Sequence, residues 1–182
     1  LRSLVGSEMC IRDSNDTQGS DAGEVKVYSW NGSAWSQLGS TIYGPSAEAG
    51  AAVGTSVDIN DEGDKIVFGA YAYDGGSTNK GIAWVYSWNG SAWVIQDNSN
   101  SDLIGGSSRD SYGWRVSFDS DGDRLAISGY GGSNSPGIVG MYEWDGSSWS
   151  IMGSTLTGSA SYDRLGYGLS LIHISEPTRL RS

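Results

Sequence analysis

Eight tryptophans are the residues of this 182-residue chain best suited to binding chemistry. An indole ring offers a broad apolar face for stacking and an N–H group for hydrogen bonding. Six of the tryptophans recur at fixed positions of an internal repeat, and a place in the core explains them most simply. Trp84 and Trp114 do not recur, and Arg115 beside Trp114 could add a charged contact. We therefore take Trp84, Trp114 and Arg115 as candidate ligand-binding residues.

The two ends of the chain carry its single cysteine, Cys10, and its single histidine, His173. A DNA segment that encodes residues 1–14 also encodes residues 169–182, without a mismatch, when its complementary strand is translated. Residues 9–14 also resemble a translated sequencing adapter. We expect residues 1–14 and 169–182 to be non-native scars and leave them out of the fold prediction. Residues 15–168 then contain no histidine or cysteine, which excludes His-dependent triads, cysteine nucleophiles, Cys/His zinc sites and disulfides there.

The charge and composition of the chain limit its partners. Its formal net charge of −10 disfavours binding to nucleic acid and to anionic membranes. No apolar run approaches the roughly 20 residues of a membrane-spanning helix, so we expect no membrane insertion. The 28 glycines and 10 tyrosines, with few prolines, are typical of short strands joined by tight turns.

An eight-residue motif recurs three times. "YSWNGSAW" occurs at residues 28–35 and 86–93, and "YEWDGSSW" follows at 142–149. Aligned on the preceding glycine, the repeats start near Gly23, Gly81 and Gly137, at intervals of 58 and 56 residues. A period of this length indicates a stacked array or a propeller.

Each repeat contains the pattern of four short strands. The first copy predicts strands at 23–30, from Ser33 onward, at 53–59 and at 65–70, and Asn-Gly and Asp-Gly pairs between them suit hairpin turns. Apolar residues occupy both faces of the first strand, so both faces need a neighbour. We predict an all-β fold of tandem four-stranded antiparallel blades within 15–168, a fragment of a β-propeller with two complete repeats and parts of flanking ones.

The order of the motifs resembles the FG-GAP repeats of integrin-α-like β-propellers, especially those of bacterial secreted and surface proteins. Val53-Gly54, Tyr112-Gly113 and Leu165-Gly166 stand at the Phe-Gly position, and Gly69-Ala70-Tyr71 stands at the Gly-Ala-Pro position. The resemblance implies a non-catalytic binding or adhesion module at the cell surface or outside the cell. It also implies a protein or glycan ligand, and neighbouring blades in a longer chain.

Some integrin-type repeats carry a calcium loop of the form D-x-D-x-D-G-x-x-D. The residues that match it here are Asp58, Asn60, Glu62, Asp119 and Asp121. Ile66 and Leu125 replace the last acid of the loop, and Ser117 replaces the first acid in the second copy. Since calcium prefers six to eight oxygen ligands, the sequence favours plain Asp-Gly hairpin turns without a cofactor. Calcium binding stays open as the alternative.

Two other functions stay open. One is a calcium-binding structural spacer within a long surface protein. The other is a propeller-type glycosidase that uses paired carboxylates. The Asp-box motif of sialidases is absent from the position where Ser117 would begin it, because Asp121 stands where that motif requires glycine. We therefore expect no enzyme activity.

Overall fold

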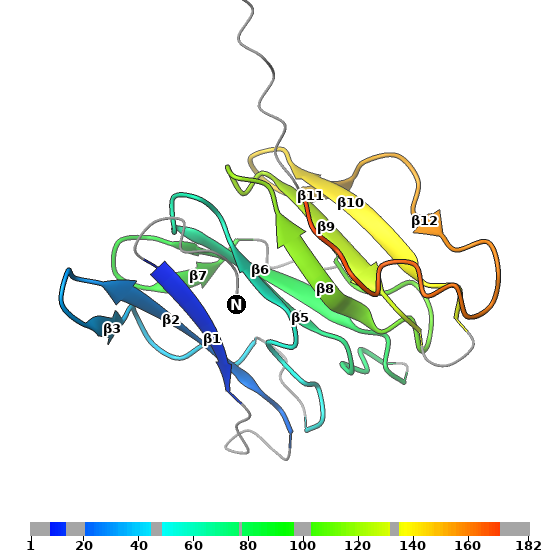
Figure 1. Cartoon of the computed structure of the whole chain (residues 1–182), viewed down its shortest axis with the longest axis horizontal. Helices are drawn as coiled ribbons and strands as arrows, with labels where there is room; N and C mark the ends of the chain where they lie inside the picture. Colours follow the sequence, from blue (N-terminus) through cyan, green and yellow to red (C-terminus); the bar gives the residue numbers. More distant parts are fainter. Residues whose placement is uncertain are drawn as a thin grey trace, which may run out of the picture.

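The computed structural model describes residues 8–13, 21–44, 49–76, 78–96, 103–131 and 135–171. These residues form three antiparallel sheets that follow one another along the chain, from blue to yellow in Figure 1. The predicted all-β, blade-like architecture is confirmed, and the array is open rather than closed into a ring. Within the described ranges, no helix is long and apolar enough to cross a membrane.

Each sheet contains one long antiparallel hairpin with a short outer strand. The first sheet has the order β1 (Glu8–Asp13), β2 (Glu24–Trp30), β3 (Trp35–Gln37). The second has the order β4 (Val57–Ile59), β5 (Lys65–Ala70), β6 (Ile82–Trp88), β7 (Trp93–Ile95). In the third, β8 (Tyr112–Phe118), β9 (Arg124–Gly129), β10 (Ile138–Trp144) and β11 (Trp149–Ile151) lie in chain order, and β12 (Leu156–Thr157) also pairs with β10.

The boundaries of the sheets do not coincide with those of the sequence repeats, because each sequence repeat is divided between two successive sheets. The repeat that starts at Gly81 contributes β6 and β7 to the second sheet and β8 and β9 to the third. The reason is the six-pair ladder between β5 and β6, from Lys65–Ser87 to Ala70–Ile82. This ladder joins the end of one sequence repeat to the start of the next.

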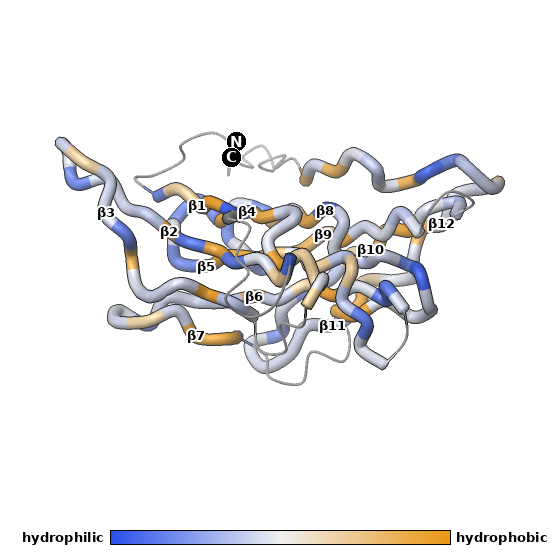
Figure 2. Tube along the Cα trace, turned by 90° about the horizontal axis from the view of Figure 1, so that it is seen from below, coloured by the Kyte–Doolittle hydropathy of each residue, from blue (hydrophilic) through white to orange (hydrophobic). Residues whose placement is uncertain are grey.

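The core consists of two apolar layers, each between successive sheets. In the first layer, residues of β2 face residues of β5 and β6; it includes Val25, Val27, Ile42, Ile66, Phe68 and Trp84. In the second, residues of the middle sheet face β9, β10 and β11; it includes Val67, Val85, Leu103, Leu125, Ile127, Tyr142 and Trp149. Figure 2 shows apolar residues recurring along the strands of all three sheets. The expectation that a blade needs a neighbour on both faces is met by the middle sheet.

At the glycine that begins each repeat, the backbone of a sheet is in close contact with the segment that leads into the next inner-strand position. The amide of Tyr112 donates a hydrogen bond to the carbonyl of Lys80 (3.2 Å), and equivalent bonds join Val53 to Ala22 (2.9 Å) and Leu165 to Pro136 (2.8 Å). The glycine after each acceptor has a φ of +76° to +80°. A Cβ on Gly81 would lie 2.2 Å from both the backbone N and O of Tyr112. We call this arrangement the inter-sheet glycine contact.

The repeated Trp–Asn–Gly motif forms a hairpin, as the sequence predicts, but not with the expected two-residue Asn-Gly turn. Four residues separate the paired Trp30 and Trp35, and of Asn31 and Gly32 only Gly32 has a positive φ (+96°). The side-chain oxygen of Asn31 accepts hydrogen bonds from the amides of Ser33 and Ala34 (3.0 and 2.9 Å). Asp145 takes this role in the third copy, and the amides of Ser148 and Ser147 lower the pKa of its carboxyl to about 2. The two tryptophans of each motif face each other at 5.4–5.5 Å between ring centroids.

The segment expected to lie outside the fold contributes an edge strand. β1 pairs with β2 from Glu8–Ser29 to Asp13–Glu24, in the register that β5 uses with β6. It satisfies the free edge of β2, and Cys10 packs against the first apolar layer. Burial, together with the charge of Asp58, raises the pKa of the Cys10 thiol to about 12. The foreign origin of residues 1–14 and 169–182 stays a prediction, and His173 lies outside the described residues.

Gly81 and Gly90 flank the same strand, β6, and allow a matched test of the inter-sheet glycine contact. Both have positive φ, but a Cβ on Gly90 would meet nothing within 4 Å. We expect Gly90→Ala to lower the free energy of unfolding by about 1–2 kcal/mol through left-handed backbone strain. Gly81→Ala should cost about 1–3 kcal/mol more because of steric overlap with the backbone of Tyr112. Urea unfolding followed by tryptophan fluorescence measures both; equal losses would contradict the contact.

Candidate ligand-binding site

The acidic residue Asp58 binds the next sheet rather than facing an open loop. It is buried, and its Oδ2 accepts hydrogen bonds from the amide of Phe118 (2.9 Å) and the hydroxyl of Ser117 (3.2 Å). In the same way, the hydroxyl oxygen of Ser56 accepts a hydrogen bond from the amide of Val116 (3.1 Å). β8 is the edge strand of its sheet, so its outward amides need such partners.

Asn60 and Asp119 organise the two Asp-Gly turns. The Oδ1 atom of Asn60 accepts hydrogen bonds from the amides of Asp64 (3.1 Å) and Lys65 (2.9 Å). The side chain of Asp119 accepts equivalent hydrogen bonds from the amides of Asp123 and Arg124 (3.0 Å each). These are hairpin-turn contacts of the kind that the sequence favours.

The remaining candidate calcium ligands, Glu62 and Asp121, are exposed. Across the part of the chain that the structure describes, no three or more His, Cys, Asp or Glu side chains are grouped so as to hold a metal ion. In this arrangement the side-chain oxygens of Asn60 and Asp58 accept hydrogen bonds from backbone amides. Calcium binding at the two turns stays an open alternative.

Calcium titration tests the assignment of the two turns as plain hairpin turns. We expect calcium at about 1 mM, the range in which extracellular modules bind it, to leave the melting temperature unchanged relative to the same concentration of magnesium. Asp121→Ala should behave like the wild type in both salts. A rise in melting temperature that is specific to calcium and lost in Asp121→Ala would contradict the assignment.

Trp84 lies in the core. Its ring packs against Phe68 and Tyr73, with both centroid distances at 5.8 Å, and the side chain is 1 % exposed. It occupies the face of β6 that packs against the first sheet, where the equivalent residue of β2 is Lys26. The equivalent residue of β10 is Gly140, so the three copies fill this position differently.

Trp114 stands at the centre of an aromatic cluster. Its ring centroid lies 5.2 Å from that of Tyr71, 5.0 Å from that of Tyr130 and 5.8 Å from that of Tyr167. Tyr130 and Tyr167 are also in contact, at 5.6 Å. These four side chains, which we call the aromatic cluster, come from the second sheet, the third sheet and the C-terminal segment. The sequence prediction found Trp114 and missed the three tyrosines.

A β-bulge aims Trp114 into the cluster. β8 and β9 pair at Tyr112–Gly129 and next at Arg115–Ser128, so Gly113 and Trp114 form an extra pair of residues on β8. Gly113 has a φ of +84°, which glycine adopts without strain. Bulges commonly re-aim a side chain near functional sites.

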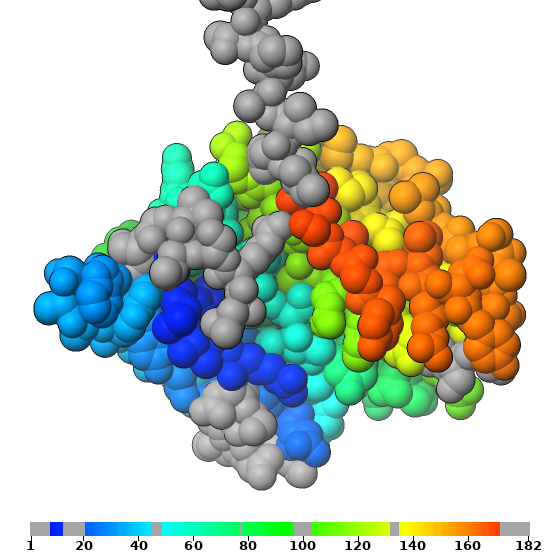
Figure 3. All heavy atoms as spheres, in the orientation of Figure 1, coloured from blue at the N-terminus to red at the C-terminus, as the bar shows by residue number. Residues whose placement is uncertain are grey.

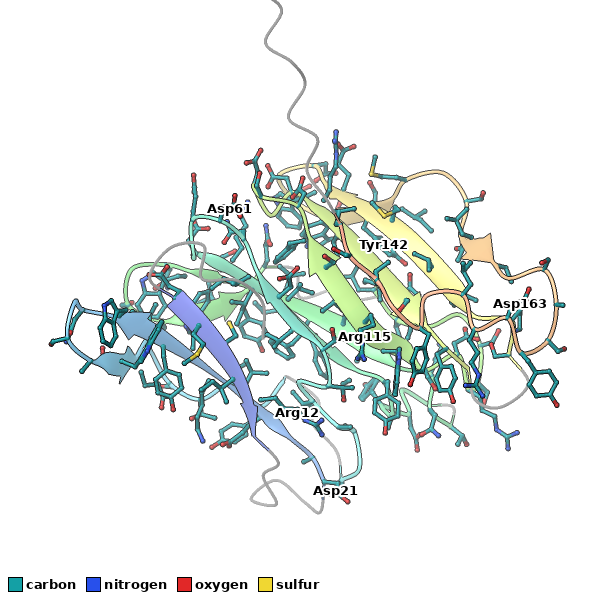
Figure 4. The ribbon with its side chains drawn as sticks, viewed as in Figure 1. Arg12, Asp21, Asp61, Arg115, Tyr142 and Asp163 are labelled. Carbon is teal, nitrogen blue, oxygen red and sulfur yellow. The ribbon has the colours of Figure 1, made fainter. Side chains whose placement is uncertain are left out.

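Arg115 and Arg164 border the aromatic cluster. The guanidinium carbon of Arg115 lies 5.3 Å from the ring centroid of Trp114, and that of Arg164 lies 5.6 Å from the ring centroid of Tyr130. Both distances are within cation–π range. Figure 4 labels Arg115 beside β8. The structure thus brings together two of the three predicted site residues, Trp114 and Arg115, and separates them from Trp84.

The cluster is partly open to solvent. Tyr167 is 51 % exposed, and Tyr71, Trp114 and Tyr130 are partly exposed. A signal for it was available in the sequence. Tyr71 and Tyr130 both follow the fourth strand of a repeat, and Trp114 and Tyr167 both follow the glycine of the Phe-Gly position.

Comparison with known proteins leaves the site to be interpreted from its geometry. No protein-family model matches this chain, and no curated protein matches it.

Proposed function

We propose that this chain is a non-catalytic recognition module of an extracellular or surface protein, and that the aromatic cluster is its ligand-binding surface. The observation that carries the proposal is the convergence of Tyr71, Trp114, Tyr130 and Tyr167 on one partly exposed spot. Tryptophan, tyrosine and arginine dominate the binding energy of most protein recognition surfaces. Tyr130 and Tyr167 do not belong to either of the two apolar layers of the fold.

A neutral glycan is the ligand class that suits this chemistry best. Aromatic ring faces can cover the apolar face of a sugar ring, while phenol hydroxyls and a guanidinium can bind its hydroxyl groups. The net charge of −10 disfavours polyanionic ligands. The likeness to FG-GAP repeats supports a place outside the cell and a role in binding or adhesion.

Tyr167 and Tyr162 provide a matched pair for testing the proposal. Both are exposed tyrosines of the C-terminal segment, at 51 % and 63 %, but only Tyr167 belongs to the aromatic cluster. We expect the chain to bind neutral oligosaccharides on a glycan array. Tyr167→Ala should weaken that binding about tenfold, which corresponds to about 1.4 kcal/mol of lost stacking. Tyr162→Ala should bind like the wild type.

Three outcomes would contradict the proposal. Equal affinity of the two variants would remove the aromatic cluster as the binding surface. Retention of no glycan by the folded wild-type chain would favour a protein ligand instead. Release of free sugar from a bound oligosaccharide would support the glycosidase alternative.

A further inference from the structure

The turns of the three repeated hairpins share one set of contacts around a residue that differs between them. Asn31 and Asn89 precede glycine in the first two copies, and Asp145 takes their place in the third. The Oδ1 atom of Asn31 accepts hydrogen bonds from the amide and the hydroxyl of Ser33 (3.0 and 2.9 Å) and from the amide of Ala34 (2.9 Å). Asn89 accepts the same three bonds in the second copy, at 2.9–3.0 Å. We call these three donors the turn clamp.

In the third copy the turn clamp holds a carboxylate. The Oδ1 atom of Asp145 accepts hydrogen bonds from the amide and the hydroxyl of Ser147 and from the amide of Ser148, each at 2.8 Å. These bonds, led by that from the amide of Ser148, lower the pKa of the Asp145 carboxyl to about 2. The turn clamp therefore favours negative charge on the side chain that it surrounds.

Around Asn31 the turn clamp has the geometry of an oxyanion hole. When a backbone amide nitrogen attacks the Cγ atom of an asparagine, negative charge develops on Oδ1. Preorganised donors at about 2.7–3.1 Å from such an oxygen lower the barrier, because they stabilise the charge as it forms. The three donors to Oδ1 of Asn31 lie at 2.9–3.0 Å.

The nucleophile for this attack is the amide nitrogen of the following glycine. Among the residues that the structure describes, none accepts a hydrogen bond from the amide of Gly32 or Gly90. A Cβ on either glycine would meet nothing within 4 Å, so no neighbour obstructs ring closure. Asn31 and Asn89 are exposed, which lets water reach both turns. Figure 3 shows the first of these hairpins, formed by β2 and β3, in blue at the left edge of the molecule.

Asn60 provides an unreactive reference in the same chain. Its Oδ1 atom also accepts two backbone amides, but the residue is only 1 % exposed. The amide of the next residue, Asp61, donates to the carbonyl of Ser120 (2.9 Å) and is therefore not free to attack. The side-chain nitrogen of Asn60 donates to Asp64 (2.8 Å), which holds the group that would have to leave.

We propose that Asn31 and Asn89 are sites of spontaneous deamidation, which converts their turns to the aspartate form of the third copy. The amide nitrogen of the glycine loses its proton and bonds to Cγ. The Cγ–Nδ2 bond breaks, and the departing nitrogen takes up a proton and leaves as ammonia. Water then opens the succinimide ring: attack at Cγ breaks its new bond to the glycine nitrogen and gives aspartate, whereas attack at the backbone carbonyl gives isoaspartate.

The turn clamp also selects between these two products. Attack of water at Cγ places the developing charge on Oδ1 again, within reach of the same donors, and so favours aspartate. Aspartate keeps all three bonds of the clamp, as Asp145 does, whereas isoaspartate adds a carbon atom to the main chain of the turn. Each conversion adds one negative charge to a chain whose formal net charge is −10.

Peptide mapping by mass spectrometry tests the sites in the full 182-residue chain, kept folded at neutral pH. We expect conversion of Asn31 and Asn89 and none of Asn60. Ser33→Ala removes one donor of the clamp and should slow conversion of Asn31 about fivefold, the effect of one ordinary hydrogen bond on a barrier. Asn89 in the same variant should convert at the wild-type rate, and Ser33→Thr, which keeps the hydroxyl, should restore the rate at Asn31. An intact Asn31, or an equal rate in Ser33→Ala, would overturn the proposal.

The ratio of the two products tests the selection independently. In urea the clamp is lost, and isoaspartate should be the main product at Asn31 because the backbone carbonyl is the more reactive side of a succinimide. In the folded chain aspartate should predominate. Labelling of the digests by an isoaspartate methyltransferase measures the isoaspartate in each. The same excess of isoaspartate in the folded and the unfolded chain would overturn the role of the clamp.

Discussion

The close backbone approach of one sheet to the next, at a glycine with positive φ, is the constraint on which the rest of the structure depends. At Gly81 and its equivalents no side chain fits between the sheets. Backbone hydrogen bonds beside the glycines, such as those from Tyr112 to Lys80 and from Val53 to Ala22, then fix the position of the next sheet. This alignment places Val67 and Val85 against Leu125 and Ile127 in the second apolar layer. It also brings Tyr71, which directly follows β5, to 5.2 Å from Trp114 of the next sheet, measured between ring centroids.

The exposed edges of the inner strands explain why acidic residues occur at positions that match part of an integrin-type calcium loop. An inner strand pairs on one side only, so the amides on its other side would lack partners inside the protein. Asp58 and Ser56 supply acceptors across the gap to β8, and Ser117 repeats the role for Leu171. Since an aspartate can accept several hydrogen bonds at once, it suits this position without a metal ion. The lysine of one turn, Lys65, reaches the carbonyl of Asp121 in the next turn and extends the same contact.

Local patterns in the sequence were enough to predict the strands, the hairpin turns and the need for face-to-face packing. Asn31-Gly32 and its copies specify a turn through the positive φ of the glycine and through the Asn side chain, which accepts hydrogen bonds from the amides of Ser33 and Ala34. These local features can be predicted without the rest of the fold. The site depends on longer-range geometry. Trp84 and Trp114 look alike in the sequence, because neither recurs. The fold separates them: the first sheet buries Trp84, whereas the bulge at Gly113 and Trp114 turns Trp114 into the partly exposed aromatic cluster. The strand formed by Glu8–Asp13 depends on the free edge of β2, which no local pattern reveals.

Amide hydrogen exchange, resolved by residue, tests most directly whether the sheets form one cooperative stack. The amides of Tyr112 and Phe118 bond across the gap between the second and third sheets, whereas that of Ile127 belongs to the ladder inside the third sheet. If packing between sheets holds the molecule together, all three amides open in the same global event and exchange at similarly slow rates. Rapid exchange at Tyr112 and Phe118, with Ile127 still protected, would mean that each sheet is stable by itself and would contradict this account.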